Sequence, residues 1–373
     1  MPRPRPRFGF AVSLLLLGAL GVGRAAAAAP PPPEPVLRWH DVREWPVEGR
    51  AWPEQPRQSW FDRLPASAEA AVSANIWRLS HDTAGMLVRF RTDATVLWVD
   101  YTLRLDRLSP VYSTAIGASG VDLYARDGGG KLRWVSVSRP EGRVVRQQLF
   151  SDPRPGLHEY VLYLPLYNGV ERCVIGVPPT ATIEPVAPPA AKPIVVYGTS
   201  ITQGAGASRP GMVYPAILGR RLERPVVNLG FSGNGKLDLA LGDLMAQIDA
   251  AVYLIDCLPN LTAAEVRAKC GPFVRRLRAA RPETPIVLAE DRRWTNSWFI
   301  PRYDDEHSDN HAALRECYAA LQAEGITGLH YIPGDALYGD DAEASVDGSH
   351  PSDLGSFRQA AVFEPVLRAA LGQ

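Results

Sequence analysis

The change of pattern on either side of residues 178–193 most constrains the fold of this 373-residue chain. That segment holds six prolines in sixteen residues, which is typical of a semi-rigid linker. Before it, short runs of β-branched and aromatic residues follow one another with almost no helical periodicity. After it, short apolar runs alternate with segments of helical period. The pattern predicts two domains, 37–177 and 194–373, joined by the linker.

The first domain reads as all β. Its candidate strands are spaced regularly and lie at 87–91, 96–101, 121–125, 132–137, 160–166 and 173–177. Asp127-Gly128-Gly129-Gly130 between two of them is a strong hairpin signal. Many short strands with turn signals predict a β-sandwich or jelly roll.

The second domain reads as α/β. Five short runs of the buried type lie at 194–197, 226–229, 251–255, 286–289 and 329–332. Apolar residues at helical spacing fall between and after them, namely Val213, Ile217 and Leu218; Val266, Phe273 and Leu277; Leu314, Tyr318 and Leu321; and Leu354, Phe357, Val362 and Val366. Strands alternating with helices predict a parallel sheet covered on both faces, with ligands beyond the carboxyl ends of the strands.

The N-terminus has the pattern of an export signal. Arg3, Arg5 and Arg7 precede an apolar run at 8–22 and an alanine tract at 25–29. We therefore expect residues 1–29 to be a cleavable signal peptide, followed by a disordered Pro-rich lead-in at 30–36. The apolar run is short for a membrane span, although an uncleaved anchor is the alternative. A secreted or periplasmic protein without stable membrane insertion is expected.

Charge and cysteine content narrow the function classes. Forty Lys and Arg balance forty Asp and Glu, so nothing favours nucleic acid or anionic lipid as a partner. Four cysteines are too few for a disulfide scaffold. Export would permit them to pair, and buried free thiols are the alternative. They are Cys173, Cys257, Cys270 and Cys317.

Ser200 and His350 are the leading candidates for chemistry. Ser200 directly follows the first strand of the second domain, and Asp347 stands three positions before His350. A serine hydroxyl needs a base within hydrogen-bond reach and a third group that holds the tautomer of that base. The chain provides these groups in the order Ser, Asp, His. The plainer alternatives are a helix-capping serine and a solvated turn.

Two further segments follow strands of the same domain. The Gly-rich turn at 228–235 could bring backbone N–H groups close to a ligand, or be a plain turn. Asn260 follows the third strand, where its amide could donate to an oxyanion or cap the helix that starts at Thr262.

Together these segments resemble the four blocks of the SGNH hydrolases, the GDSL esterase superfamily. The matched residues are Ser200, Gly230, Asn260, and Asp347 with His350. The resemblance implies a flavodoxin-like three-layer α/β/α domain and a Ser200–His350–Asp347 triad that needs no metal or cofactor. It also implies an oxyanion hole made by the N–H groups of Ser200 and Gly230 and the side chain of Asn260. Thr199 departs from the usual Asp or Asn, and Leu261 from a second Asp in the third block.

A narrower resemblance covers the first domain. Gly120-Val121-Asp122-Leu123-Tyr124 is similar to the Gly-x-Asp-Leu-Tyr motif of a β domain found ahead of certain SGNH hydrolases and acyltransferases. In those relatives the front domain is a jelly-roll-like sandwich packed beside the active site. We expect Asp122 and Tyr124 to be a turn residue and a packed ring, without a catalytic role.

Two other clusters are weaker. Trp294 and Trp298 follow the fourth strand and could stack on sugar rings or cover an acyl chain, or pack against the front domain. His307 and His311 superficially suggest a metal site but lack the spacing of a zincin, so we expect a polar loop before a helix and no metal.

These observations lead to three hypotheses. The first is an exported serine esterase that removes small acyl groups, with acetyl favoured, from a carbohydrate or similar small-molecule ester. The second keeps the serine but passes the acyl group to an alcohol other than water. The third is a glycan-binding protein with a disabled catalytic domain.

Overall fold

The computed structural model describes residues 35–373. The predicted signal peptide at 1–29 and residues 30–34 of the predicted lead-in lie outside the described residues. Within residues 35–373, none of the helices has both the length and the apolar content that crossing a membrane requires.

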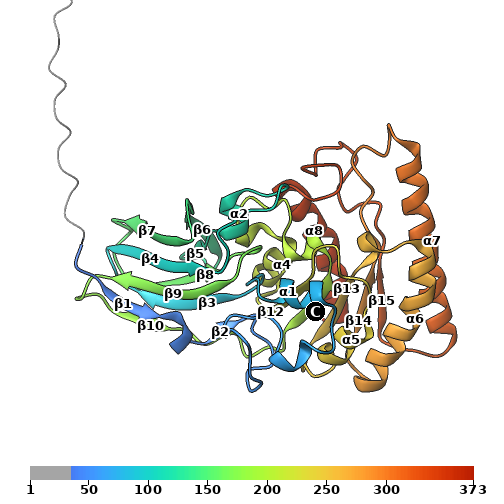
Figure 1. Cartoon of the computed structure of the whole chain (residues 1–373), viewed down its shortest axis with the longest axis horizontal. Helices are drawn as coiled ribbons and strands as arrows, with labels where there is room; N and C mark the ends of the chain where they lie inside the picture. Colours follow the sequence, from blue (N-terminus) through green and yellow to red (C-terminus); the bar gives the residue numbers. More distant parts are fainter. Residues whose placement is uncertain (1–34) are drawn as a thin grey trace, which may run out of the picture. The chain divides into compact units, whose positions relative to one another are not determined.

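The first domain contains two antiparallel sheets (Figure 1). One has the order β1-β9-β4-β7, with β1 (Arg38–Asp41), β9 (Val170–Val177), β4 (Val96–Leu103) and β7 (Val144–Ser151). The other has the order β10-β3-β8-β5-β6, with β10 (Ile183–Pro185), β3 (Leu87–Thr92), β8 (His158–Tyr163), β5 (Asp122–Arg126), β6 (Leu132–Val137), and β2 (Val47–Glu48) paired to β3. The predicted β-sandwich is confirmed.

Alternation of side chains explains why these strands pack as a sandwich. Along β4, every second residue is fully buried, and these residues share one core with Phe90 of β3 and Leu162 of β8 on the other sheet. The predicted hairpin forms between β5 and β6, where the Asp127 N–H donates to the Lys131 carbonyl at 2.8 Å.

The structure adds elements that the sequence pattern did not indicate. Strands β1, β2, β7 and β10 were not predicted, nor were the helices η1 (Val42–Glu44), η2 (Ala66–Ala68), α1 (Ala74–Ser80) and α2 (Ala115–Ser119). Strand β10 lies inside the predicted linker and pairs antiparallel with β3. Pro185 can close it because β10 is an edge strand, where a missing N–H costs no ladder hydrogen bond.

The second domain is a five-stranded parallel sheet between two helical layers, as predicted. The strand order is β12-β11-β13-β14-β15, with β11 (Ile194–Gly198), β12 (Val226–Gly230), β13 (Val252–Asp256), β14 (Ile286–Ala289) and β15 (Leu329–Ile332). Counted within the domain this is 2-1-3-4-5, the flavodoxin-like order.

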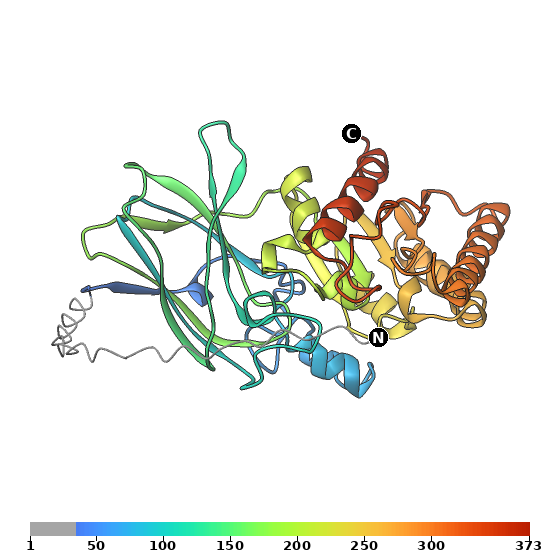
Figure 2. The same ribbon diagram turned by 90° about the horizontal axis from the view of Figure 1, so that it is seen from above.

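Helices cover both faces of this sheet (Figures 1 and 2). One face carries α5 (Leu239–Met245), α6 (Ala263–Ala280) and α7 (Pro301–Ala323), and the other carries α4 (Tyr214–Leu222) and α8 (Asp353–Ala370). The short helices α3 (Ser200–Gln203), η3 (Pro210–Met212) and η4 (Leu258–Asn260) lie in the connections.

The register of the sheet brings three of the predicted site segments to one edge. Gly198 at the end of β11 lies opposite Gly230 of β12 and Asp256 of β13. The segments that follow these strands begin with Thr199, Phe231 and Cys257 and therefore start side by side.

Part of the first domain packs on the second. Trp52, Leu64 and Ile76 are buried in one cluster with residues of β11, β12 and α5. The indole N–H of Trp52 donates to the carbonyl of Leu244 at 3.2 Å. Segment 51–80 therefore completes the core of the α/β domain, although it precedes that domain in the sequence.

One local prediction is wrong, because His307 and His311 lie within helix α7 and not in a loop before a helix. The predicted last helix is present as α8, but Leu354 and Phe357 are 43% and 52% exposed, and the buried face of the helix contains Gly355, Ala360 and Phe363. Gly355 permits this close approach, since a Cβ there would lie 2.1 Å from the carbonyl oxygen of Ala344.

Candidate active site

Ser200 is the first residue of helix α3, immediately beyond strand β11. Thr199 is the N-cap, and its hydroxyl accepts the N–H of Ile201 at 3.3 Å. The alternative that Ser200 itself caps the helix is therefore wrong. A Thr can stand where Asp or Asn is usual in the family motif because all three side chains can cap a helix. The Ser200 hydroxyl is left free for other partners.

The structure brings Ser200, His350 and Asp347 together in one hydrogen-bonded row. Ser200 Oγ lies 2.9 Å from His350 Nε2, and His350 Nδ1 lies 2.7 Å from Asp347 Oδ2. Burial opposes ionisation of Asp347, but hydrogen bonds from His350 and from the Ser349 N–H outweigh it, so the pKa of Asp347 lies below its usual value. Asp347 is therefore a carboxylate at neutral pH.

The loop that carries His350 is held by hydrogen bonds within itself. Asp347 Oδ1 accepts the backbone N–H groups of Ser349 at 3.0 Å and His350 at 2.8 Å. The Val346 N–H donates to the His350 carbonyl at 2.9 Å, and Ser345 and Pro351 form an isolated antiparallel bridge. The spacing of three residues thus lets one carboxylate hold both the ring and the backbone of His350.

Gly230 does not lie where the predicted oxyanion hole requires it. Its N–H donates to Asn228 Oδ1 at 2.9 Å, and a Cβ on Gly230 would lie 2.2 Å from the backbone N of Gln203. The glycine is needed for the close approach of β12 and α3, and its donor is already engaged. This part of the prediction is corrected: Gly230 packs, and its N–H does not face a ligand.

Gly233 fits the role better. Its φ is +70°, and a Cβ built there would meet nothing within 4 Å. Among residues 35–373, neither the Gly233 N–H nor the Ser200 N–H has a protein acceptor. Sequence reasoning chose the first glycine of the 228–235 turn because it could not see that the Asn228 side chain folds back on Gly230.

Asn260 ends helix η4 and lies against the same turn. In the amide orientation that satisfies both of its polar atoms, Asn260 Oδ1 accepts the N–H groups of Asn234 and Gly235, each at 3.2 Å. Its Nδ2 therefore faces away from that turn and can donate. The cap of the next helix is Thr262, which forms a capping box with Glu265, so Asn260 is not required for capping.

Two tyrosines of the front domain reach this site, and no sequence pattern indicated them. The Tyr112 ring stacks on the His350 imidazole, with centroids 4.7 Å apart and planes 22° apart. The Tyr112 hydroxyl lies 3.1 Å from Ser232 Oγ. The Tyr167 hydroxyl donates to the Ser200 carbonyl at 3.1 Å. Their loops lie far from Ser200 in sequence, so only the folded chain relates them to it.

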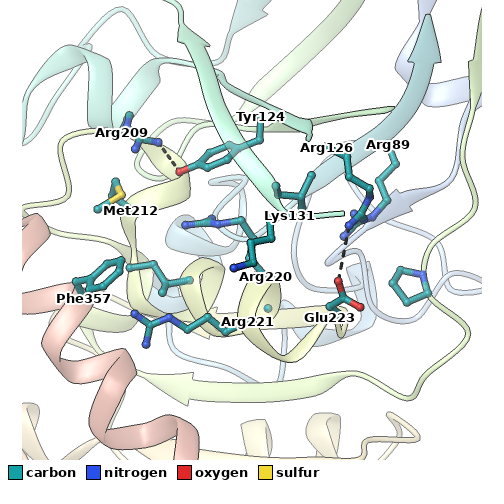
Figure 3. Close-up of a pocket in the computed structure, with 14 residues that line it drawn as sticks. Arg89, Tyr124, Arg126, Lys131, Arg209, Met212, Arg220, Arg221, Glu223 and Phe357 are labelled. Carbon is teal, nitrogen blue, oxygen red and sulfur yellow. Dashed lines mark hydrogen bonds and ion pairs between the residues drawn. The ribbon is translucent and has the colours of Figure 1, made fainter. Parts of the chain in front are cut away.

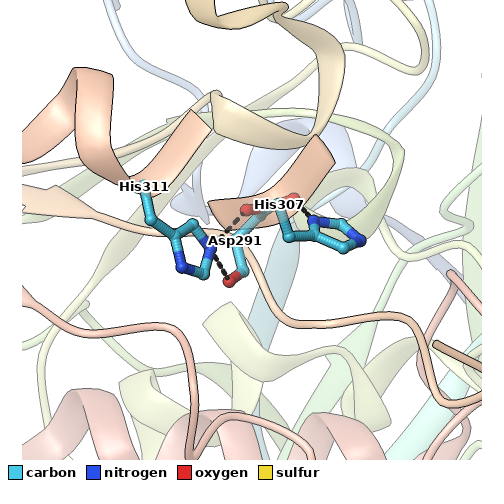
Figure 4. A group of neighbouring side chains, drawn as sticks. All are labelled: Asp291, His307 and His311. Atoms are coloured by element: carbon cyan, nitrogen blue, oxygen red, sulfur yellow. Dashed lines mark hydrogen bonds and ion pairs between the residues drawn. The ribbon is translucent and has the colours of Figure 1, made fainter. Parts of the chain in front are cut away.

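A buried network behind the histidine loop begins at Asp291, just past strand β14 (Figure 4). Asp291 Oδ2 lies 2.8 Å from His307 Nδ1, and Asp291 Oδ1 lies 2.8 Å from His311 Nε2. Arg292 donates to Asp291 Oδ2 at 3.1 Å, to the Ser349 carbonyl at 2.9 Å and to the Ser349 hydroxyl. The network therefore reaches the residue next to His350.

The same cluster has the residue types of a metal site, since the ligand atoms of Asp291, His307 and His311 lie within 4.8 Å of one another. Its chemistry fits a hydrogen-bond network better. The carboxylate already accepts from both imidazoles, and the Arg292 guanidinium shares one of its oxygens. A divalent cation would sit beside that positive charge in a buried place. The absence of a metal from the reaction stays a prediction.

The two tryptophans have different surroundings. Trp294 packs against Tyr303, with ring centroids 4.3 Å apart. Trp298 is 79% exposed, beside Phe299. Their segment touches the histidine loop, because the Thr295 N–H donates to the Gly348 carbonyl at 2.9 Å. Trp294 is half-buried and Trp298 is exposed, and the role of both in substrate binding stays a prediction.

A pocket of about 660 Å³ lies elsewhere in the structure, and its lining contains none of the candidate site residues (Figure 3). Its cations are mostly paired with carboxylates, for example Arg209 with Asp122 at 2.8 Å and Arg221 with Glu364 at 3.3 Å. Asp122 of the Gly-x-Asp-Leu-Tyr motif also accepts the Gly211 N–H at 2.8 Å. It is thus a fully buried anchor between the two domains rather than a residue of a turn.

The cysteines are free thiols in this structure. Three are buried and Cys317 is half-buried. Their burial agrees with the second of the two alternatives open from the sequence.

Comparisons with known proteins agree with this architecture. The model of the GDSL-like lipase/acylhydrolase family matches residues 191–368. A second model, described as the N-terminus of SGNH-hydrolase-type esterases and called GxDLY, matches residues 37–183. A search of curated proteins found no match.

Solved structures extend the likeness over most of the chain. A Bacteroides ovatus protein described as a GDSL-like lipase is 30% identical, with 90% of this chain and 98% of that chain covered and a TM-score of 0.86. A salicylyl-acyltransferase from a tetracycline biosynthetic pathway is 19% identical, with 90% and 98% covered and a TM-score of 0.69. An acetyl xylan esterase from Butyrivibrio proteoclasticus is 12% identical, with 90% and 99% covered and a TM-score of 0.57. With both family models, the order of the motifs and the whole-length likeness in agreement, this chain belongs to the SGNH hydrolases, the GDSL-like lipase/acylhydrolase family, and carries the GxDLY domain ahead of its α/β domain.

Proposed function

We propose that this member of the esterase family is an exported serine esterase that removes a small acyl group, acetyl in the first place, from a carbohydrate ester. The observation that carries the proposal is the row Ser200 Oγ–His350 Nε2–His350 Nδ1–Asp347 Oδ2, with separations of 2.9 and 2.7 Å. These distances suit a nucleophile, its base and the group that orients the base.

In the proposed reaction His350 accepts the Ser200 proton while Ser200 Oγ attacks the ester carbonyl. The tetrahedral intermediate then collapses, and His350 gives the proton to the leaving alcohol. Water, deprotonated by the same imidazole, attacks the acyl-enzyme and releases the acid and the free serine. Asp347 keeps Nδ1 protonated and stabilises the imidazolium that forms in both steps.

Three donors are proposed to hold the oxyanion: the N–H groups of Ser200 and Gly233 and the Asn260 Nδ2. Gly233 replaces Gly230 in this set because its N–H is not engaged by another side chain. Loss of one such donor commonly lowers turnover by about 10²–10³.

The substrate class and the location rest on less direct support. The acetyl xylan esterase named above shares the fold, which makes acetylated polysaccharides the first substrates to test. The exposed Trp298 and Phe299 offer faces on which a sugar ring could stack. Export is proposed from the basic and apolar pattern of residues 1–29.

The test compares the wild-type protein with Ser200→Ala on para-nitrophenyl esters of two to twelve carbons and on acetylated oligosaccharides followed by mass spectrometry. We expect hydrolysis by the wild type, with preference for acetyl, and loss of activity in the variant. Equal rates for the two proteins would remove the nucleophile assignment. Added alcohols that collect the acyl group in place of water would favour the acyltransferase alternative. An inactive wild type that binds the oligosaccharides would favour the glycan-binding one.

A further inference from the structure

A second pocket lies beside the candidate active site. Its volume is about 300 Å³. Nearly all of its lining comes from the front domain, from the end of α1 and from the loop between β4 and α2. The α/β domain contributes Ser232, from the turn that also carries Gly233.

The inner wall of this pocket is part of the proposed catalytic site. Tyr112, which lines it, stacks on His350 and hydrogen-bonds to Ser232. Tyr167, which also lines it, donates to the carbonyl of Ser200. An ester bound at Ser200 would therefore have the pocket directly next to it.

The outer wall is positively charged. Arg78 and Arg107 line it. Within residues 35–373 neither lies within 4.0 Å of a carboxylate oxygen, although Arg78 is close enough to Asp82 to stabilise its charged form. The Arg107 Nε donates to the Ser109 carbonyl at 3.0 Å, which restricts that side chain. Unpaired arginines beside a cavity are free to bind an anion with several N–H donors.

The one acidic lining residue, Asp82, offsets only part of this charge, because a single carboxylate faces two arginines. Asp82 is 4% exposed. Its Oδ2 accepts a hydrogen bond from Gln203 Nε2 at 3.0 Å, and its Oδ1 lies 3.4 Å from Arg104 Nη2. Each carboxylate oxygen thus has a partner, Gln203 or Arg104, and neither of these two residues lines the pocket. Because the whole chain is electrically balanced, the positive pocket is a local feature and not a result of overall charge.

We propose that this pocket is a subsite for an anionic group on the ester substrate, a carboxylate or a sulfate on the sugar, held by Arg78 and Arg107. The inference rests on the proposed function and narrows it, since it selects acidic over neutral carbohydrate esters. The front domain would then determine specificity, while the α/β domain supplies the reacting groups.

The experiment measures kcat/KM for three acetylated methyl glycosides that differ in one group: a galacturonide, a galactoside 6-sulfate and the neutral galactoside. We expect the wild type to prefer at least one charged ester, and added NaCl to reduce that preference. In Arg78→Gln and Arg107→Gln, the charged-to-neutral ratio should fall roughly two- to fivefold each, because exposed ion pairs are individually modest. The double variant should lose about the product of the two effects.

Arg154→Gln is the matched control, because Arg154 is an exposed arginine of the β7–β8 connection that does not line the pocket. Its ratio should equal that of the wild type. A second readout avoids turnover: Ser200→Ala should bind galacturonate or sulfated oligosaccharides more tightly than its Arg78→Gln derivative does.

An unchanged charged-to-neutral ratio in both pocket variants would overturn the subsite, even if the wild type hydrolyses para-nitrophenyl acetate and Ser200→Ala does not. A wild type without esterase activity would instead refute the proposed function, while the binding readout would still report on the subsite.

Discussion

Single side chains decide most of the proposed chemistry, and their geometry makes Asp347 testable. The Asp347→Asn variant keeps an oxygen for the N–H groups of Ser349 and His350, but it no longer offers a carboxylate to His350 Nδ1. We expect kcat to fall at least about 10²-fold, because the imidazole loses its orienting charge. Thermal unfolding should change little, since the Asp347 side chain is 39% exposed. Near-wild-type kcat would mean that another group orients His350.

Asn260 provides a test of the oxyanion hole. In Asn260→Asp the side chain still accepts the N–H groups of Asn234 and Gly235, but it cannot donate. The expected result is a kcat lower by about 10²–10³ with little change in melting temperature. Equal kcat values for the wild type and this variant would exclude the amide from the oxyanion hole.

At the residue scale, the sequence predicts best the features that depend on local information. Ser200 follows a strand directly, and Asp347 lies three positions before His350, so each feature can be read from a few neighbouring residues. The error at Gly230 has a physical cause: the turn contains several glycines, and hydrogen bonding by the Asn228 side chain decides which N–H stays free. Tyr112 could not be found because its partner His350 lies in the other domain.

At the scale of elements, the contact between the segment after β14 and the loop that carries His350 should control the position of the histidine. Arg292 is 4% exposed and joins Asp291 to Ser349. Three different nitrogens of the guanidinium reach Asp291 Oδ2, the Ser349 carbonyl and the Ser349 hydroxyl. Lysine carries all of its donors on one nitrogen and cannot span these acceptors, so Arg292→Lys should loosen the loop and lower kcat about ten- to a hundredfold. Faster hydrogen exchange of residues 347–350 should accompany the loss.

The neighbouring Arg293→Lys is the control for that experiment. Arg293 forms exposed ion pairs with Asp304 at 2.7 Å and Asp335 at 2.8 Å, outside the loop. Its substitution should leave both kcat and the exchange of residues 347–350 near wild type. Equal behaviour of the two variants would contradict a positioning role for Arg292.

The end of β13 carries a buried acid that should make stability depend on pH. Asp256 is 1% exposed and accepts the Tyr214 hydroxyl at 2.8 Å. Burial raises its pKa to about 7, above the usual value of about 3.9 for an unfolded chain. The folded state therefore holds this proton more tightly, and its contribution to stability is lost as the pH rises from about 4 to 7.

Asn cannot ionise, so Asp256→Asn should gain stability relative to wild type as the pH rises. Each pKa unit corresponds to about 1.4 kcal/mol, and we expect a relative gain of about 2–3 kcal/mol between pH 5 and pH 8. Urea unfolding of both proteins at the two pH values measures it. Parallel pH dependences would show that Asp256 is not the responsible group.

On the scale of the whole molecule, part of the front domain packs into the α/β domain, although the two are separate in the sequence. The buried Arg63 of the front domain donates to the Gly230 carbonyl at 2.6 Å and the Asn228 carbonyl at 3.2 Å, at the end of β12. The Pro-rich segment and the change from strand to helix patterns predicted a boundary between a sandwich and a parallel sheet, and both folds are confirmed. These patterns could not predict that segment 51–80 packs on the later domain, because its apolar residues have no regular period.

A chain of residues 194–373 alone should therefore fail to fold stably. It would expose the surface that Trp52, Leu64 and Ile76 cover and leave buried carbonyls of β12 without donors. We expect aggregation or a non-cooperative melt by near-ultraviolet circular dichroism, beside a cooperative melt for residues 36–373. A melting temperature equal to that of the longer chain would contradict this dependence.

The stacking of Tyr112 on His350 also has an evolutionary consequence. The ring sits on a surface loop of the sandwich, where insertions and replacements are tolerated more readily than in the sheet below. Related proteins could therefore differ in this loop, and so in the substrates that they accept, while the α/β domain that carries Ser200 and His350 stays the same.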